Sequence, residues 1–209
     1  MKDLIIVGAG GFGREVLYLA LAINAHSKEW NIKGFINDDL NALDNIRCDY
    51  KILGKIKEWQ PKSNEVFAMG IASPQAKEKL SKSLIEKGAE FVTLIHPRAV
   101  IQPFTQIGAG SVIGHSASIG DNVTIGNFVN IMGSMIGQDS IIGDYSTTTG
   151  FTNVASANIG KRVFIGSHAV ILNHLTVGDD AYICAGSIVF SKVKPGTKIF
   201  GYPAKKMNF

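Results

Sequence analysis

The chain has 209 residues, of which 45% are hydrophobic and 18% charged, and its formal net charge is +4. This composition is typical of a folded globular protein with room for one large or two small domains, and it argues against disorder. The lysines do not cluster with aromatic residues, which argues against nucleic-acid binding, and no apolar run reaches the length of a membrane span. The first residues do not form a secretory signal, and the two cysteines, Cys48 and Cys184, lie far apart in sequence. We therefore expect a cytoplasmic protein.

The first 94 residues are predicted to alternate strands with helices. A buried apolar strand leads through a glycine-rich loop into a helix, and the apolar face of that helix holds Val16, Leu17, Leu19, Ala20 and Ile23. Three further strands are expected within residues 31–38, 64–71 and 90–96, the last of which leads into the second half of the chain.

A second helix is predicted at residues 73–88, with Ser73 as its N-cap, Pro74 in its first turn and Gly88 at its end. Strands that alternate with helices in this way form parallel sheets. The sequence therefore predicts a small parallel α/β domain at residues 1–94, with a ligand crevice at the carboxyl ends of its strands.

The loop "GAGGFG" at residues 8–13 matches the glycine pattern of dinucleotide-binding folds, through Gly8, Gly10 and Gly13, with Gly11 as an extra glycine. Backbone amides at the start of the following helix are able to bind a pyrophosphate. A complete dinucleotide fold needs roughly twice the chain that is present before residue 95, so a nicotinamide cofactor is a poor candidate. One half suits a single nucleotide diphosphate such as a UDP-sugar, with Asn37 or Asp38 placed to contact the ribose or base. Alternatively, the glycines serve only a tight turn.

Aliphatic residues recur every six positions from residue 95 onward. The repeat keeps one register from Ile95 to Ile131, slips by one residue into a second register that ends at Val154, and slips again into a third that runs to Val189. Glycine usually follows the aliphatic residue. Such hexads are the signature of a parallel β-helix, in which each step makes one short strand and one corner.

Three hexads close one coil, so residues 95–190 supply roughly five coils. The aliphatic residue of each step points into the tube, and glycine accepts the backbone geometry of the corner. A β-sandwich would instead require alternation of period two and hairpin turns, which this region lacks. We therefore predict a β-helix domain with a C-terminal tail at residues 95–209.

An α/β domain that begins "IIVGAGGFGREV", followed by hexads and the ending "GYPAK", resembles the bacterial sialic-acid O-acetyltransferase and bacillosamine-type nucleotide-sugar N-acetyltransferase family. The likeness extends over essentially the whole chain. It implies a left-handed β-helix, a homotrimer that binds acetyl-CoA in the groove between neighbouring subunits, and a nucleotide sugar held by the N-terminal domain.

In that family, a histidine followed by an acidic residue takes a proton from the acceptor, and the acid orients the imidazole. The matching stretch here is "GQDS", so the resemblance assigns the catalytic positions to Gln138 and Asp139. Asp139 fits the pattern. Gln138 does not, because a carboxamide cannot hold a proton at neutral pH.

Three further departures from the family pattern point the same way. A second histidine of the family matches Thr147, and the histidine often seen in its glycine loop matches Phe12. The segment "FTNVASANIG" is one residue shorter than its counterpart, which is expected to reshape a coil beside the site. His115, His168 and His174 follow inward aliphatic residues and are expected near corners. Any of them is a candidate base, although a structural role or contact with water is the commoner use of such a residue.

For the CoA side, the resemblance places Ser156, Ser167 and Ala185 along the pantetheine arm and Gly201, Pro203 and Lys205 near the nucleotide end. Lys205 and Lys206 are able to meet phosphate as point charges, or they belong to an ordinary solvated tail. No spacing of His, Cys or Asp indicates a metal site.

The sequence thus predicts a homotrimeric acyltransferase that moves an acetyl group from acetyl-CoA to a nucleotide-linked sugar in surface-glycan synthesis. An amine acceptor is favoured, because an amine is able to attack without a strong base whereas a sugar hydroxyl is not. The alternative is a catalytically silent trimer of the same fold that binds a nucleotide sugar. Neither membrane insertion nor nucleic-acid binding is expected.

Overall fold

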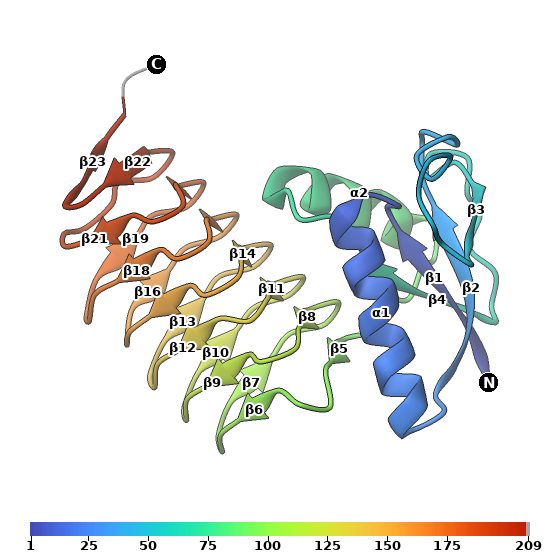
Figure 1. Cartoon of the computed structure of the whole chain (residues 1–209), viewed down its shortest axis with the longest axis horizontal. Helices are drawn as coiled ribbons and strands as arrows, with labels where there is room; N and C mark the ends of the chain where they lie inside the picture. Colours follow the sequence, from blue (N-terminus) through green and yellow to red (C-terminus); the bar gives the residue numbers. More distant parts are fainter. Residues whose placement is uncertain (208–209) are drawn as a thin grey trace.

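The structure is a computed structural model that describes residues 1–207, so the last two residues of the predicted second domain lie outside the described part. The N-terminal part contains β1 (Lys2–Val7), α1 (Gly11–His26), β2 (Trp30–Ile36), β3 (Lys51–Gly54), β4 (Glu65–Met69) and α2 (Pro74–Glu86). The four strands form one parallel sheet in the order β3-β2-β1-β4 (Figure 1). The carboxyl ends of β1, β2 and β4 therefore meet at one edge, next to the start of α1.

Most elements of this sheet follow from the apolar pattern. All five residues of the predicted apolar face of α1 are buried, and α2 spans most of the predicted range, with Gly88 beyond its end in the left-handed region (φ 94°). Ser73 is the N-cap residue of α2, as predicted, although its side chain makes no cap bond. One expectation was wrong: the stretch expected to be a strand at residues 90–96 holds only an isolated bridge at Phe91 and the two residues of β5. The short edge strand β3 was not predicted.

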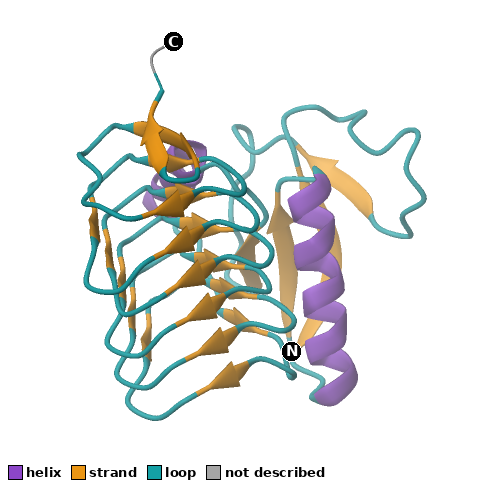
Figure 2. Ribbon diagram, turned by 60° about the vertical axis from the view of Figure 1, so that its left-hand side comes forward, coloured by secondary structure: helices purple, strands orange, loops and turns teal. Residues whose placement is uncertain are grey.

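The rest of the chain is a parallel β-helix whose strands are almost all two residues long (Figure 2). Its strands are β5 (Leu94–Ile95), β6 (Val100–Ile101), β7 (Gln106–Ile107), β8 (Val112–Ile113), β9 (Ser118–Ile119), β10 (Thr124–Ile125), β11 (Asn130–Ile131), β12 (Met135–Ile136), β13 (Ile141–Ile142), β14 (Thr147–Thr148), β15 (Asn153–Val154), β16 (Asn158–Ile159), β17 (Phe164–Ile165), β18 (Val170–Ile171), β19 (Thr176–Val177), β20 (Tyr182–Ile183), β21 (Ile188–Val189), β22 (Lys198–Gly201) and β23 (Ala204–Lys206).

These strands stack into three faces. Face 1 contains β5, β8, β11, β14, β17, β20 and β22, with β23 antiparallel at its end. Face 2 contains β6, β9, β12, β15, β18 and β21, and face 3 contains β7, β10, β13, β16 and β19. The six strands of face 2, one for each coil, give six coils within residues 1–207, one more than the hexad count predicted. We name the corners by the faces they join.

The inward aliphatic residues of the hexads form one continuous core, from Ile113 to Ile199, whose members are all buried. The polar Thr148 takes one inward place, as its position in the repeat predicted. It is buried, and its hydroxyl lies 2.9 Å from that of Ser134. The repeat therefore determines both the stacking and the core.

Two steps of the helix have five residues instead of six. They run from Ile131 to Ile136, at a corner between faces 1 and 2, and from Val154 to Ile159, at a corner between faces 2 and 3. The inward residues still pair in register on each side of the shortened steps, for example Ile136 with Val154 and Ile142 with Ile159. The missing residue is thus absorbed by the corner and not by the strands.

The α/β domain packs against face 1 of the β-helix (Figure 1) and contacts the corners on both sides of this face. Met132 of a corner between faces 1 and 2 packs with the α1 cluster, and Arg162 of a corner between faces 3 and 1 pairs with Glu78 of α2. Leu94 and Val112 of face 1 share a hydrophobic cluster with α1, and Lys77 of α2 reaches Thr147 of β14. Neither helix within residues 1–207 has the length and hydropathy that a membrane span requires.

Candidate functional site

The glycine loop joins β1 to α1 in a turn that side chains would not allow. Gly8 has a positive φ of 98°, and a Cβ atom on Gly13 would lie 2.0 Å from the carbonyl oxygen of Gly8. The strand and helix therefore approach more closely than any residue with a side chain would permit, which is one of the uses of glycine in nucleotide-binding turns.

The middle of the loop faces open space. Gly10 and Gly11 are exposed, and a Cβ atom on either would meet nothing within 4 Å. The first backbone bond of the helix runs from the amide of Arg14 to the carbonyl of Gly10, so the amides that precede Arg14 begin the helix without an intrahelical partner. Such amides, together with the helix dipole, suit an anion.

Asn37 and Asp38 lie directly after β2, beside this loop. The Asn37 side chain accepts a hydrogen bond from the amide of Ala9 (3.1 Å) and donates one to the carbonyl of Asp39 (2.7 Å). Asp38 accepts from the amide of Lys57 (3.3 Å). The structure therefore brings Asn37 to the glycine loop, where it holds the loop in place. A contact between either side chain and a nucleotide stays a prediction.

Gln138 and Asp139 lie at a corner between faces 2 and 3, on a different side of the β-helix from α1. Both are exposed, and Asp139 occupies the left-handed position of the corner (φ 58°). Its carboxylate accepts a hydrogen bond of 2.7 Å from the side chain of Asn122, one coil below. Asp139 has therefore no imidazole to orient within its own corner.

A hollow of about 280 Å³ opens beside Gln138. It is lined by Gln102, Ser118, Gly120, Met135, Ile136, Gly137, Gln138, Asn153, Ala155, Ser156 and Asn173. The shortened step from Val154 to Ile159 lies in the layer directly above Gln138, and the amide of Ser156 would be 3.0 Å from a Cβ atom on Gly137. The hollow therefore coincides with the place where one corner residue is missing.

The lining of this hollow is polar but does not titrate near neutral pH. Four carboxamides and two hydroxyls offer hydrogen bonds in both directions, and none of the lining residues is His, Asp, Glu, Lys or Cys. The arrangement is able to bind and orient a polar ligand. Proton transfer requires a group from outside the lining.

The three candidate histidines are divided between two columns of corners. His174 lies at a corner between faces 2 and 3, two coils above Asp139, and its amide donates to the carbonyl of Ser156 in the hollow (3.0 Å). His115 and His168 lie at corners between faces 1 and 2, where His115 packs edge-on against His96 (5.0 Å between ring centroids) and His168 stacks on Phe151 (5.1 Å). His174 alone of the three shares the corner column of Gln138.

The residues predicted for CoA are divided in the same way. Ser156 lies at a corner between faces 2 and 3, whereas Ser167 and Ala185 lie at corners between faces 1 and 2. The two columns are separated by the width of face 2. One chain therefore does not bring the three residues together.

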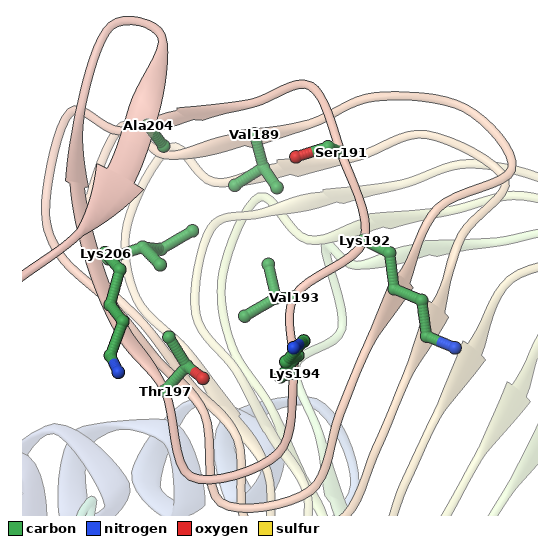
Figure 3. Close-up of a pocket in the computed structure, with 9 residues that line it drawn as sticks. Val189, Ser191, Lys192, Val193, Lys194, Thr197, Ala204 and Lys206 are labelled. Carbon is green, nitrogen blue, oxygen red and sulfur yellow. The ribbon is translucent and has the colours of Figure 1, made fainter.

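Gly201, Pro203 and Lys205 belong to the β22–β23 hairpin, which closes the last coil, and the Tyr202–Pro203 peptide bond is cis. A hollow of about 310 Å³ lies under this hairpin, with Val189 and Val193 pointing into it (Figure 3). Lys192, Lys194 and Lys206 line it, but Lys205 does not. The hollow is the open end of the hydrophobic tube, at the last coil of the β-helix.

No group of three or more potential metal ligands comes together in the part of the chain that the structure describes.

Two family models match the chain, one for each half. Residues 3–84 match the PglD N-terminal domain and residues 95–194 match the GMPPB C-terminal domain. Among curated proteins, GDP-perosamine N-acetyltransferase of Escherichia coli O157:H7 is 29% identical over 129 residues, which are 59% of this chain and 56% of that protein. UDP-N-acetylbacillosamine N-acetyltransferase of Bacillus subtilis (strain 168) is 27% identical over 117 residues, 54% of this chain and 51% of that protein.

These matches support the resemblance to the bacillosamine-type nucleotide-sugar N-acetyltransferases that the sequence indicated. The matches span only about half the length of the curated members, 56% and 51% respectively. One solved structure, a histidine-to-asparagine mutant of perosamine N-acetyltransferase from Caulobacter crescentus in complex with CoA and GDP-perosamine, has a TM-score of 0.89 at 20% identity. It covers 100% of this chain and 98% of that one.

The predicted fold class of the family is confirmed: a small parallel α/β domain followed by a left-handed parallel β-helix. The boundary at residue 94 stays a prediction. Sequence reasoning missed three carboxamides of the hollow beside Gln138, namely Gln102, Asn153 and Asn173, because they come from different coils. It also missed Lys77, which lies fully buried between the two parts of the chain.

Proposed function

We propose that this protein transfers an acetyl group from acetyl-CoA to the amine of a nucleotide-linked amino sugar. The proposal rests on one observation above all: two curated nucleotide-sugar N-acetyltransferases are similar to more than half of the chain, and residues 3–84 match the PglD N-terminal domain. In this domain the glycine loop is open where a diphosphate would bind. A role in surface-glycan synthesis is part of the same proposal, as is the predicted binding of acetyl-CoA.

We further propose that the active site is shared between copies of the chain in a homotrimer. Gln138, Asp139 and Ser156 lie on one column of corners, whereas Ser167 and Ala185 lie on another. The two columns can face each other only if one column comes from one copy of the chain and the other column from a second copy. Face 2, which lies between them, exposes two large apolar side chains, Val100 (57% exposed) and Met135 (59% exposed), as an interface surface would.

The chemistry in this proposal needs little from Gln138. The amine nitrogen attacks the thioester carbonyl carbon, a C–N bond forms, and the C–S bond breaks as the CoA thiolate leaves with the electron pair. Gln138 and its carboxamide neighbours orient the acceptor by hydrogen bonds. A neutral amine begins the attack without a base, and the proton that its nitrogen loses afterward passes to His174 or to water.

A carboxamide in place of a histidine is compatible with ligand binding in a protein of this fold. In the solved perosamine N-acetyltransferase, a mutant with asparagine in place of a histidine was crystallised with both CoA and GDP-perosamine. By analogy, we infer that Gln138 leaves binding of both substrates intact and lowers the rate of transfer alone. Loss of a general base commonly reduces a rate by about 10²- to 10⁴-fold.

The test is titration calorimetry with acetyl-CoA and with UDP-, GDP- and TDP-linked amino sugars, followed by measurement of free thiol in the same mixtures. We expect micromolar binding of acetyl-CoA and of one nucleotide sugar, with thiol release above background only when both are present. No binding of acetyl-CoA, even with a nucleotide sugar bound, would contradict the proposal.

A second function is favoured by one observation, the absence of a titratable residue from the lining beside Gln138. Under it, the protein is a catalytically silent trimer that binds a nucleotide sugar. It predicts nucleotide-sugar binding with no thiol release from acetyl-CoA at any pH, and the same experiment separates the two functions.

A further inference from the structure

A buried polar cluster joins the α/β domain to face 1 of the β-helix, and we call it the interdomain clamp. It consists of Lys77 of α2, Asn130 of β11 and Thr147 of β14, whose exposed fractions are 0%, 0% and 1%. All three side chains come from positions that no part of the proposed chemistry uses.

The clamp binds the segment that connects β4 to α2. The hydroxyl of Thr147 donates a hydrogen bond to the carbonyl oxygen of Ala72 (2.7 Å), and the side-chain amide of Asn130 donates one to the carbonyl oxygen of Ile71 (3.2 Å). Lys77 Nζ donates to Thr147 Oγ1 (3.0 Å) and to the carbonyl oxygen of Ser146 (3.2 Å). Two consecutive carbonyls of the connecting segment are therefore held by side chains of the β-helix.

The connecting segment is in turn packed on the glycine loop. The amide of Gly70 donates to the carbonyl of Val7 (2.8 Å), and a Cβ atom on Gly70 would lie 2.8 Å from the Cα atom of Gly13. A Cβ atom on Gly8 would meet the Ile71 side chain at 2.5 Å. The backbones of Gly70 and Gly13 leave no room for a Cβ atom between them, and the Ile71 side chain fills the space beside Gly8, so a displacement of Ile71 and Ala72 acts on the glycine loop as well.

The clamp buries polar groups that are not fully paired, which costs folding free energy. Lys77 has no carboxylate partner among the described residues, and the Asn130 side-chain oxygen is buried without a hydrogen-bond partner. Burying such groups is unfavourable unless their geometry is needed. A plain apolar contact would join the domains at less cost, but it would not fix the positions of two particular carbonyls.

We propose that Lys77, Asn130 and Thr147 are positioning residues for the nucleotide subsite: through the carbonyls of Ile71 and Ala72 they fix the glycine loop relative to the β-helix. This inference rests on the proposed function, because it assigns the loop a nucleotide diphosphate. It also explains what Thr147 does at a position where the family often has a histidine. Here the position holds the nucleotide end of the site and has no direct part in the chemistry.

The test compares Thr147→Val, which keeps the shape and removes the hydroxyl, with Thr147→Ser, which restores it. Thr124→Val is the matched control, since Thr124 is the exposed outward residue of β10. Binding of UDP and GDP reports on the glycine loop, and binding of CoA reports on the other subsite. We expect Thr147→Val to weaken nucleotide binding by about 3- to 10-fold, the effect of one buried hydrogen bond, with CoA affinity unchanged. Thr147→Ser and Thr124→Val should resemble the wild type.

A second measurement needs no ligand. Hydrogen exchange at the amides of Gly8, Ala9 and Gly70, which each donate a hydrogen bond, should accelerate in Thr147→Val and in Lys77→Met while exchange in the distant β19 stays constant. Unchanged exchange at these amides, or an equal loss of CoA affinity, would overturn the inference. A wild type that binds neither UDP nor GDP, with the expected acceleration in Thr147→Val, would contradict the proposed function and leave the mechanical connection standing.

Discussion

Lys77 is a fully buried lysine that no sequence motif predicted. Burial alone holds the pKa of this ammonium group well below its ordinary value, and the structure offers only neutral acceptors to it. The helical spacing of residues 77, 81 and 84 already indicated in the sequence that Lys77 lies on the buried face of α2. Lys77, Ser81 and Leu84 lie on one face of α2 and all are buried, but a lysine at a core position is normally read as a gap in the pattern.

We predict that Lys77 makes the protein more stable as pH rises. Between the lowered pKa of the folded state and the unfolded value of about 10.4, Lys77 is neutral when folded and protonated when unfolded, so the unfolded chain binds the additional proton. The unfolding free energy therefore increases with pH through that window, by up to about 1.4 kcal/mol per unit.

In Lys77→Met this contribution disappears. Urea unfolding at several alkaline pH values should give a flatter dependence of the unfolding free energy on pH than the wild type shows. Identical slopes in the two proteins would mean that Lys77 stays charged in the fold. The nearby charges of Glu78 and Arg162, which pair with each other, are common to both proteins and cancel in the comparison.

Gln138 makes the second prediction at this scale. Gln138→His should raise the rate of transfer by about 10²-fold or more, since it supplies a group that titrates near neutrality next to Asp139. If His174 accepts the proton in the natural protein, His174→Asn should lower the rate of transfer, whereas His115→Asn should not. In the Gln138→His background, the effect of His174→Asn should vanish.

Initial rates of thiol release at several pH values check this set of variants. A rate in Gln138→His that equals the wild-type rate, with both substrates bound, would show that the corner does not carry the chemistry and would favour the silent trimer.

At the scale of elements, the strand, loop and helix of the nucleotide subsite depend on one close approach. Gly13→Ala places a methyl group 2.0 Å from the carbonyl oxygen of Gly8, which is backbone and cannot rotate away. We expect a loss of about 1–3 kcal/mol in unfolding free energy and weaker binding of UDP and GDP.

Gly11→Ala is the matched control. It lies in the first turn of the same helix, where a Cβ atom meets nothing within 4 Å, so a small gain in stability is expected from its helix propensity. Chemical unfolding of the two variants beside the wild type measures both effects. Equal stabilities would show that the loop relaxes and that the close approach is not required.

The elements of the fold could be predicted from local patterns, and the site only in part. Hexads with a period of six place Ile113 or Ile183 in the core whatever surrounds them, because each coil stacks on the next. The hollow beside Gln138 depends instead on which residues of other coils lie above and below it, and both slips of register must be placed before Asn153 and Asn173 align with it. The interdomain clamp depends on how α2 docks on face 1, which no local pattern determines.

At the scale of the whole molecule, the shared site makes a prediction about mixed assemblies. Ser156→Trp obstructs the column of Gln138, and Ser167→Trp obstructs the column between faces 1 and 2 that holds Ser167 and Ala185, so each variant alone should be inactive. If the site lies between copies, co-expression of the two should restore activity, because some interfaces join two intact columns. Random assembly gives about one quarter of the wild-type number of sites.

Activity of the co-purified mixture, together with its mass from light scattering, measures the outcome. Mixed particles that remain inactive would place the site within a single chain. The comparison of the mixture with the single variants requires that each variant assembles normally. We expect this because both serines are half-buried at corners, outside the hydrophobic core.

The five-residue step between Val154 and Ile159 has a consequence for how such chains diverge. Above and below it the inward residues keep their partners, so a step one residue shorter than a hexad alters the outline of one corner without disturbing the coils on either side. Insertions and deletions, which in most folds shift everything downstream, are here confined to the layer where they occur. Proteins with this fold are therefore able to change their binding surface one corner at a time, by changes in the length of a corner as well as by changes of side chain.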